Sequence, residues 1–130
     1  MNKKNKDMFV IENKELTINA LNHVEGALKS SLNNMKLIND NRSNKDFDTS
    51  KSCKETIELL VFLVKTLDHT DKITKLSKDL DYLYKHCIFC LVRVRDHNDY
   101  AFLSSSIKVL SEISEGWERI NAAVAKSLGN

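Results

Sequence analysis

The 130-residue sequence contains no proline and only three glycines. Proline is the strongest helix breaker, and glycine is the residue that hairpin turns and phosphate-binding loops most often need. The scarcity of glycine argues against sandwich, barrel, Rossmann and P-loop folds. The length is that of one domain, which can bury a core without disulfides or a structural metal. The sequence therefore predicts a single all-α domain.

Long apolar runs and an excess of one charge are also missing. The longest apolar run, residues 59–64, is far shorter than the roughly 20 residues of a membrane span, and residues 8–11 are too few for a signal peptide. The 20 basic and 18 acidic residues are interspersed, without the basic face of a nucleic-acid-binding domain. Three cysteines fit a reducing compartment better than a disulfide framework. We expect a soluble, cytoplasmic protein with no nucleic-acid partner and no membrane insertion.

Apolar side chains recur every three or four residues in four segments, which is the spacing of amphipathic helices. These segments cover about residues 15–39, 48–67, 72–95 and 99–128. Asp48, Thr49 or Ser50 is expected to cap the second helix, Thr70 the third and Asn98 the fourth. Because the connections are short, neighbouring helices should be antiparallel. We predict an up-down four-helix bundle over residues 15–128, with a flexible, loosely attached N-terminal arm over residues 1–14.

The second and third segments carry more apolar side chains than one core-facing stripe needs. At 100° per residue, several of them point away from the stripe, and Tyr84 flanks it. One interpretation is that they are ordinary surface residues, or that the apolar part of the arm folds back over them; that part is Met8, Phe9, Val10 and Ile11. The other is an elongated exterior strip that binds an amphipathic helix of another protein. The candidate binding residues are Leu59, Phe62, Tyr84, Ile88, Phe89 and Val92.

Several short motifs follow one another at characteristic spacing along these segments. They are Glu25-Gly26-Ala27-Leu28, Leu67-Asp68, Leu83-Tyr84 and a Trp117 that lies eighteen residues after Asp99. In order and spacing they resemble the flagellar secretion chaperone family, FliS, over about residues 15–122. The sequence departs from the family in its arm, which has Phe9 but no tyrosine, and at His23-Val24, where the family has Leu-Tyr.

The resemblance implies a cytoplasmic helical bundle with no enzyme activity, no cofactor and no metal. Members of that family hold the disordered C-terminal segment of flagellin, prevent its premature polymerisation and present it to the flagellar type III export apparatus. The expected partner is therefore flagellin, with an export-gate component and other flagellar proteins as further candidates. The exterior strip would be the surface that binds this client.

Two features leave other functions open. Cys87-x-x-Cys90 has the spacing of a metal or redox motif, but it lies on the core stripe and has no second pair, so we expect core thiols. His23 is the one candidate for a phosphotransfer module, although the carboxylate of Glu25 would repel a phosphate on the ring. A helical adaptor for a different secreted client is the third alternative. No catalytic residue is assigned.

Overall fold

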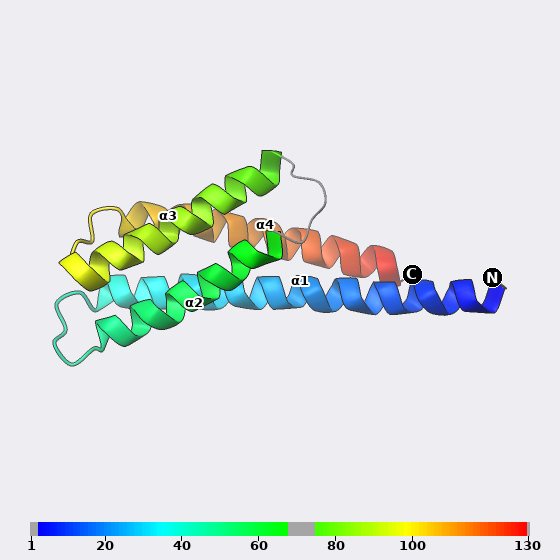
Figure 1. Cartoon of the computed structure of the whole chain (residues 1–130), viewed down its shortest axis with the longest axis horizontal. Coiled ribbons are helices and arrows are strands. Elements are labelled where there is room, and N and C mark those ends of the chain that lie inside the picture. Colours follow the sequence, from blue (N-terminus) through cyan, green and yellow to red (C-terminus); the bar gives the residue numbers. More distant parts are fainter. Residues whose placement is uncertain (1–2, 68–74, 130) are drawn as a thin grey trace.

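A computed structural model describes residues 3–67 and 75–129, with side chains described for 22–67, 78–120, 122, 123, 126 and 127. These residues form α1 (Lys3–Asp40), α2 (Thr49–Leu67), α3 (Lys75–His97) and α4 (Leu103–Gly129), and no strand occurs among them. Successive helices run in opposite directions (Figure 1). The predicted antiparallel four-helix bundle is confirmed.

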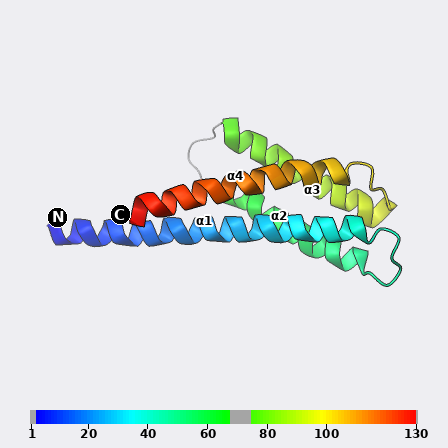
Figure 2. The ribbon, with the colours of Figure 1, turned by 180° about the vertical axis from the view of Figure 1, so that it is seen from behind.

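The four helices are arranged as a ring. Among the described residues, α1 packs against α2 and α4, α3 packs against the same two helices, and the backbones of the diagonal pairs do not come close to each other. The α2–α3 pair crosses α1 and α4 obliquely, as Figures 1 and 2 show from opposite sides. The seam between α3 and α4 is the smallest of the four. The α1/α2 and α3/α4 seams therefore lie on opposite faces of the bundle.

The first helix is longer than the sequence pattern predicts. It begins at Lys3 instead of near Glu15, so residues 3–14 continue α1 as helix. Its N-terminal turns extend beyond the end of α4 (Figure 2). The physical reason is that no proline or glycine occurs before Gly26 to interrupt the helix. The side chains of residues 8–11 lie outside the described ones, so the self-capping role of the arm stays a prediction.

Two helix ends are fixed by local hydrogen bonds. Asp48 caps α2, because its Oδ1 accepts the Lys51 N–H at 3.0 Å. The sequence predicted that Asn98 caps α4, and this is wrong. Asn98 instead ends α3 in the left-handed conformation, with φ of 53°. The Asn98 N–H donates to the Val94 carbonyl at 3.0 Å, which satisfies one of the last free carbonyls of that helix. Thr70 lies outside the described residues.

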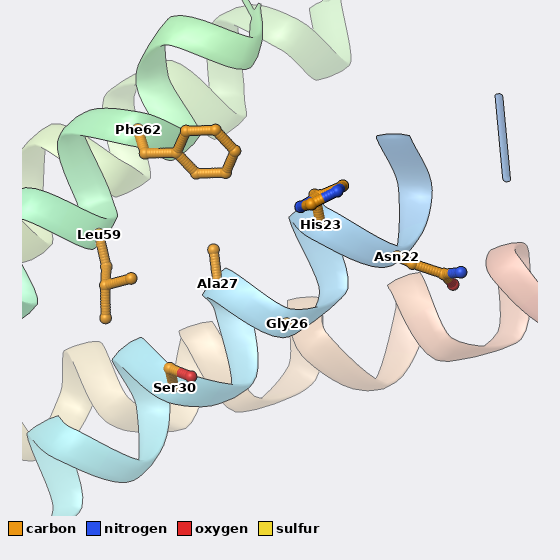
Figure 3. Close-up of a pocket in the computed structure, with 7 residues that line it drawn as sticks. All are labelled: Asn22, His23, Gly26, Ala27, Ser30, Leu59 and Phe62. Carbon is orange, nitrogen blue, oxygen red and sulfur yellow. The ribbon is translucent and has the colours of Figure 1, made fainter. Parts of the chain in front are cut away.

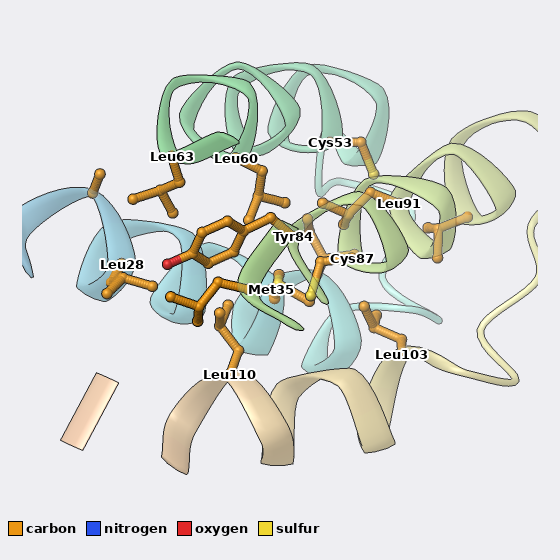
Figure 4. Packing of buried hydrophobic residues seen from close by; sticks show 14 residues of the cluster. Leu28, Met35, Cys53, Leu60, Leu63, Tyr84, Cys87, Leu91, Leu103 and Leu110 are labelled. Atoms are coloured by element: carbon orange, nitrogen blue, oxygen red, sulfur yellow. The ribbon is translucent and has the colours of Figure 1, made fainter. Parts of the chain in front are cut away.

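The core is formed by one stripe from each helix, shown in Figure 4. The buried apolar side chains at its centre are Leu28, Met35, Cys53, Leu60, Leu63, Tyr84, Cys87, Leu91, Leu103 and Leu110. Trp117 packs against this cluster, as expected. Among the described residues, no helix is long and apolar enough to cross a membrane.

The three cysteines are core thiols, as the sequence predicted. Cys53, Cys87 and Cys90 are all buried and unbridged. Burial raises the pKa of the Cys53 thiol to about 11 and that of Cys87 to about 12, because a charged thiolate is disfavoured away from water. No cluster of three or more potential metal ligands occurs in the described part of the chain.

Candidate functional site

A groove of about 460 Å³ runs along the seam between α1 and α2 (Figure 3). It is lined by Asn22, His23, Gly26, Ala27 and Ser30 of α1 and by Leu59 and Phe62 of α2. The five α1 residues share one face over about two helical turns, which is about 12 Å of helix. None of the seven is an Asp, Glu, Lys or Arg. The groove is therefore short, open and free of formal charge when His23 is neutral.

The two walls of this groove differ in side-chain size. On α1, Gly26, Ala27 and Ser30 are small and leave the helix backbone close to the groove. On α2, Leu59 is half-buried and Phe62 keeps 41% of its surface exposed. A Cβ atom placed on Gly26 would meet no other atom within 4 Å. The result is a large apolar wall beside a floor of small residues, which suits an incoming apolar side chain.

A second apolar surface lies beside the seam between α3 and α4, and we call it the aromatic face. Its rings on α3 follow one another along the helix: Tyr82 and His86 are stacked at 6.3 Å between centroids, and His86 and Phe89 are also 6.3 Å apart. Tyr82 is 74% and Phe89 52% exposed. His86 Nε2 lies 3.6 Å from the Cys90 sulfur, which is itself 3.2 Å from Ser106 Oγ of α4. These contacts show that the rings border α4.

Exposed apolar residues of α4 and the turn before it extend the aromatic face. Phe102, Val109 and Ile120 are exposed and lie at helical spacing from Ser106, on the side of α4 that contacts α3. The spacing of the core stripes did not indicate that these residues, or Tyr82, belong to an exterior surface. The available signal was a second apolar stripe, displaced by one residue from the core stripe of Leu103 and Leu110.

Tyr84 was predicted to contact a client and is instead a core residue. It is only 1% exposed and is the largest fully buried side chain. Its ring points toward Leu28 and Leu60 (Figure 4), and burial raises its pKa to about 12 despite a hydrogen bond from the Trp117 side chain. At 100° per residue, Tyr84 lies at the margin of the core-facing stripe of α3, and from the sequence it was therefore expected outside the core. In the structure α2 covers that margin. Tyr84 therefore supports the bundle from inside.

The other predicted residues do not form one strip. Leu59 and Phe62 line the α1/α2 groove, whereas Phe89 belongs to the aromatic face on the opposite side. Ile88 and Val92 are half-buried, and helical geometry places them on the side of α3 turned away from Cys90, toward α2. The exterior apolar surface predicted from the sequence is therefore divided among three seams.

The seam between α1 and α4 is polar by contrast. Lys29 Nζ lies 2.8 Å from Glu118 Oε1 across this seam and 3.1 Å from Glu25 Oε1 on its own helix. The hydrogen bond to Glu118 is the main cause that raises the pKa of Lys29. The same pairing turns Glu25 toward Lys29. His23, the residue weighed for phosphotransfer, is exposed at the α1/α2 groove.

Comparison with known protein families gives a match to this chain. The model of a protein family described as flagellar protein FliS matches residues 4–124, which is nearly the whole chain. No curated protein and no solved structure matches the sequence. The match includes all four helices and therefore both apolar surfaces.

Proposed function

Because the chain belongs to the FliS family of flagellar proteins, we propose that it is the export chaperone of flagellin in its cell. It binds the disordered C-terminal segment of flagellin in the cytoplasm and carries out no chemical reaction. A flagellin whose C-terminal segment is held cannot pack into a filament, and it is presented to the flagellar type III export apparatus. A component of the export gate and other flagellar proteins are further proposed partners.

The α1/α2 groove is the observation that carries this proposal. An amphipathic helix that lays its apolar side into such a groove removes Phe62 and Leu59 from water. A phenylalanine side chain presents roughly 200 Å², so the 41% of Phe62 that is exposed corresponds to roughly 80 Å². At about 25 cal/mol per Å², its burial contributes about 2 kcal/mol.

The aromatic face supports a client that is extended rather than folded. It lies across the bundle from the groove, so a compact partner cannot cover both surfaces. A disordered segment can wrap around the bundle and fold locally at each contact. In this arrangement Phe89 and Tyr82 form the second contact, and Ile88 and Val92 lie along the path between the two.

The energetics fit a reversible complex. Phe62, Tyr82, Phe89 and Phe102 together provide several kcal/mol of apolar burial. Ordering a disordered segment opposes binding by about 2–5 kcal/mol or more, and loss of translational freedom opposes it further. We expect a dissociation constant between micromolar and nanomolar, tight enough to hold the client and weak enough to release it at export.

A polymerisation assay tests this function. Flagellin of the same organism is induced to polymerise with and without an equimolar amount of the protein, and filament growth is followed by light scattering. We expect the protein to suppress growth and an excess of the isolated C-terminal flagellin peptide to restore it. Undiminished growth with the protein present would refute the proposal.

A further inference from the structure

We propose that Gly26 is a clearance position, where a helical turn of the flagellin segment seats a large apolar side chain against the backbone of α1. This inference rests on the proposed function. It concerns one point of the α1/α2 groove and one kind of occupant.

The free protein gives no steric reason for a glycine at position 26. Glycine in the interior of a helix is destabilising relative to alanine, because it leaves the unfolded chain more freedom. A Cβ on Gly26 would meet nothing within 4 Å, so alanine would fit without strain. The position also lacks the positive φ that would require glycine. The free bundle therefore does not require a glycine at position 26. Unlike Gly116, which shares this open space, Gly26 lines the α1/α2 groove, so the space above it is accessible to a bound side chain.

The surroundings of Gly26 determine the chemistry of that occupant. Figure 3 shows Phe62 and Leu59 of α2 opposite the α1 residues that form the floor of the groove, with His23 one turn before Ala27. No Asp, Glu, Lys or Arg side chain lines the groove, so a charged group would lose hydration without gaining an ion pair with any of these residue types. An uncharged, apolar side chain gains contact with the ring of Phe62.

The size of the groove indicates a helical occupant. Its floor extends over about two turns of α1, or about 12 Å, which matches about two turns of a second helix. Small residues at a helix interface allow the two backbones to approach closely, and a glycine allows the closest approach. We therefore assign the groove to a short helix within the flagellin C-terminal segment, with its largest apolar residue above Gly26.

Substitutions at Gly26 test the assignment. Gly26→Ala and Gly26→Leu are compared with the wild type in titrations with the isolated C-terminal flagellin peptide, and melting temperatures are measured for all three. Both variants should remain folded. We expect binding to weaken severalfold for Gly26→Ala and at least tenfold for Gly26→Leu. Ala122→Leu is the matched control: Ala122 is exposed on α4 outside the groove, and its variant should bind within twofold of the wild type.

The possible results separate this inference from the proposed function. Absence of binding by the wild type would refute the proposed function. Wild-type binding with an unchanged Gly26→Leu variant would refute only the role of Gly26. If Gly26→Leu is unfolded, the Gly26→Ala variant replaces it, and unchanged binding by that variant would refute the role of Gly26. Hydrogen exchange is a second measurement: the peptide should slow exchange of the amides of residues 22–30 in the wild type, and unchanged exchange would likewise refute the assignment. A free wild-type dimer that Gly26→Leu dissociates would instead assign the groove to a second copy of the chain and overturn the proposal.

Discussion

Phe62 and Phe89 are exposed aromatic side chains on opposite faces of the bundle. Replacing either with glutamate puts a charge where the proposed client would exclude water, so we expect a loss of flagellin binding of at least tenfold. The free energy of unfolding should fall by less than the about 2–5 kcal/mol that truncation of a buried leucine costs, because about half of each ring already faces solvent. Calorimetric titration and urea unfolding measure the two effects.

Leu60 provides the matched control for these variants. It is fully buried beside Leu63, so Leu60→Ala should lower the free energy of unfolding by about 2–5 kcal/mol. If Phe62→Glu or Phe89→Glu were destabilised to a similar degree, that residue would belong to the core and its assignment to a binding surface would be wrong.

The buried thiols make stability depend on alkaline pH. Burial raises the pKa of Cys87 to about 12 from its ordinary value of 9.0, so between these values the unfolded chain loses a proton that the folded chain keeps. The stabilisation is fully present below pH 9 and is lost as the pH rises toward 12. We expect the free energy of unfolding to fall in this window by about 1.4 kcal/mol per pH unit for each such thiol.

Urea unfolding at several pH values between 8 and 10.5 checks this dependence. The Cys87→Ala variant should have a lower free energy of unfolding at every pH. Its free energy of unfolding should also fall less steeply with pH, by the contribution of one thiol. A slope identical to that of the wild type would mean that Cys87 ionises equally easily in the folded protein.

From the sequence, individual residues could be assigned to the core or the surface only as accurately as helical periodicity permits. It located Phe62 and Phe89 outside the core because they lie far from the apolar stripe in angle. Tyr84 lies near the margin of the stripe, where the angle alone does not tell whether a neighbouring helix covers the side chain. Its burial depends on how α2 packs against α3, which is a property of the tertiary structure.

At the scale of elements, Asn98 determines where α3 ends. Its φ of 53° is accessible to asparagine and glycine but strained for a β-branched residue. We expect Asn98→Val to lower the free energy of unfolding by about 1–2 kcal/mol and Asn98→Gly to leave it within about 0.5 kcal/mol. Thermal or urea unfolding measures both, and equal stability of the valine variant would contradict the left-handed conformation.

Gly116 offers an element-scale comparison with Gly26. It lies in the interior of α4, and an added Cβ would also meet nothing within 4 Å. Gly116→Ala should raise the free energy of unfolding by about 0.5–1 kcal/mol through helix propensity, and Gly26→Ala should do the same. Chemical denaturation of both variants tests this. Destabilisation by either would reveal a steric conflict in the free bundle.

The positions of the helices were largely predictable, and their ends less so. Apolar spacing located all four, and the run of residues without proline or glycine before Gly26 could have predicted the longer α1. Asn98 was expected to cap α4 but instead ends α3, because a polar residue between two helices can end the first or begin the second. Only its backbone conformation distinguishes the two.

For the whole molecule, the bundle and its antiparallel order follow from short connections between amphipathic helices. The division of the apolar surface does not. It depends on the ring order of the helices and on the oblique crossing of the α2–α3 pair. The groove at the α1/α2 seam is one of the resulting surfaces. Neither the ring order nor the crossing is encoded in the periodicity of a single helix, so the sequence predicted one strip where the structure has separate surfaces.

The most direct measurement is a calorimetric titration of the protein with full-length flagellin and with flagellin that lacks its C-terminal segment, at several temperatures. We expect one-to-one binding to the full-length form with a large negative heat-capacity change, because apolar surface is buried, and no binding to the truncated form. Equal binding to both forms, or no binding to either, would contradict the assignment of the C-terminal segment of flagellin as the client.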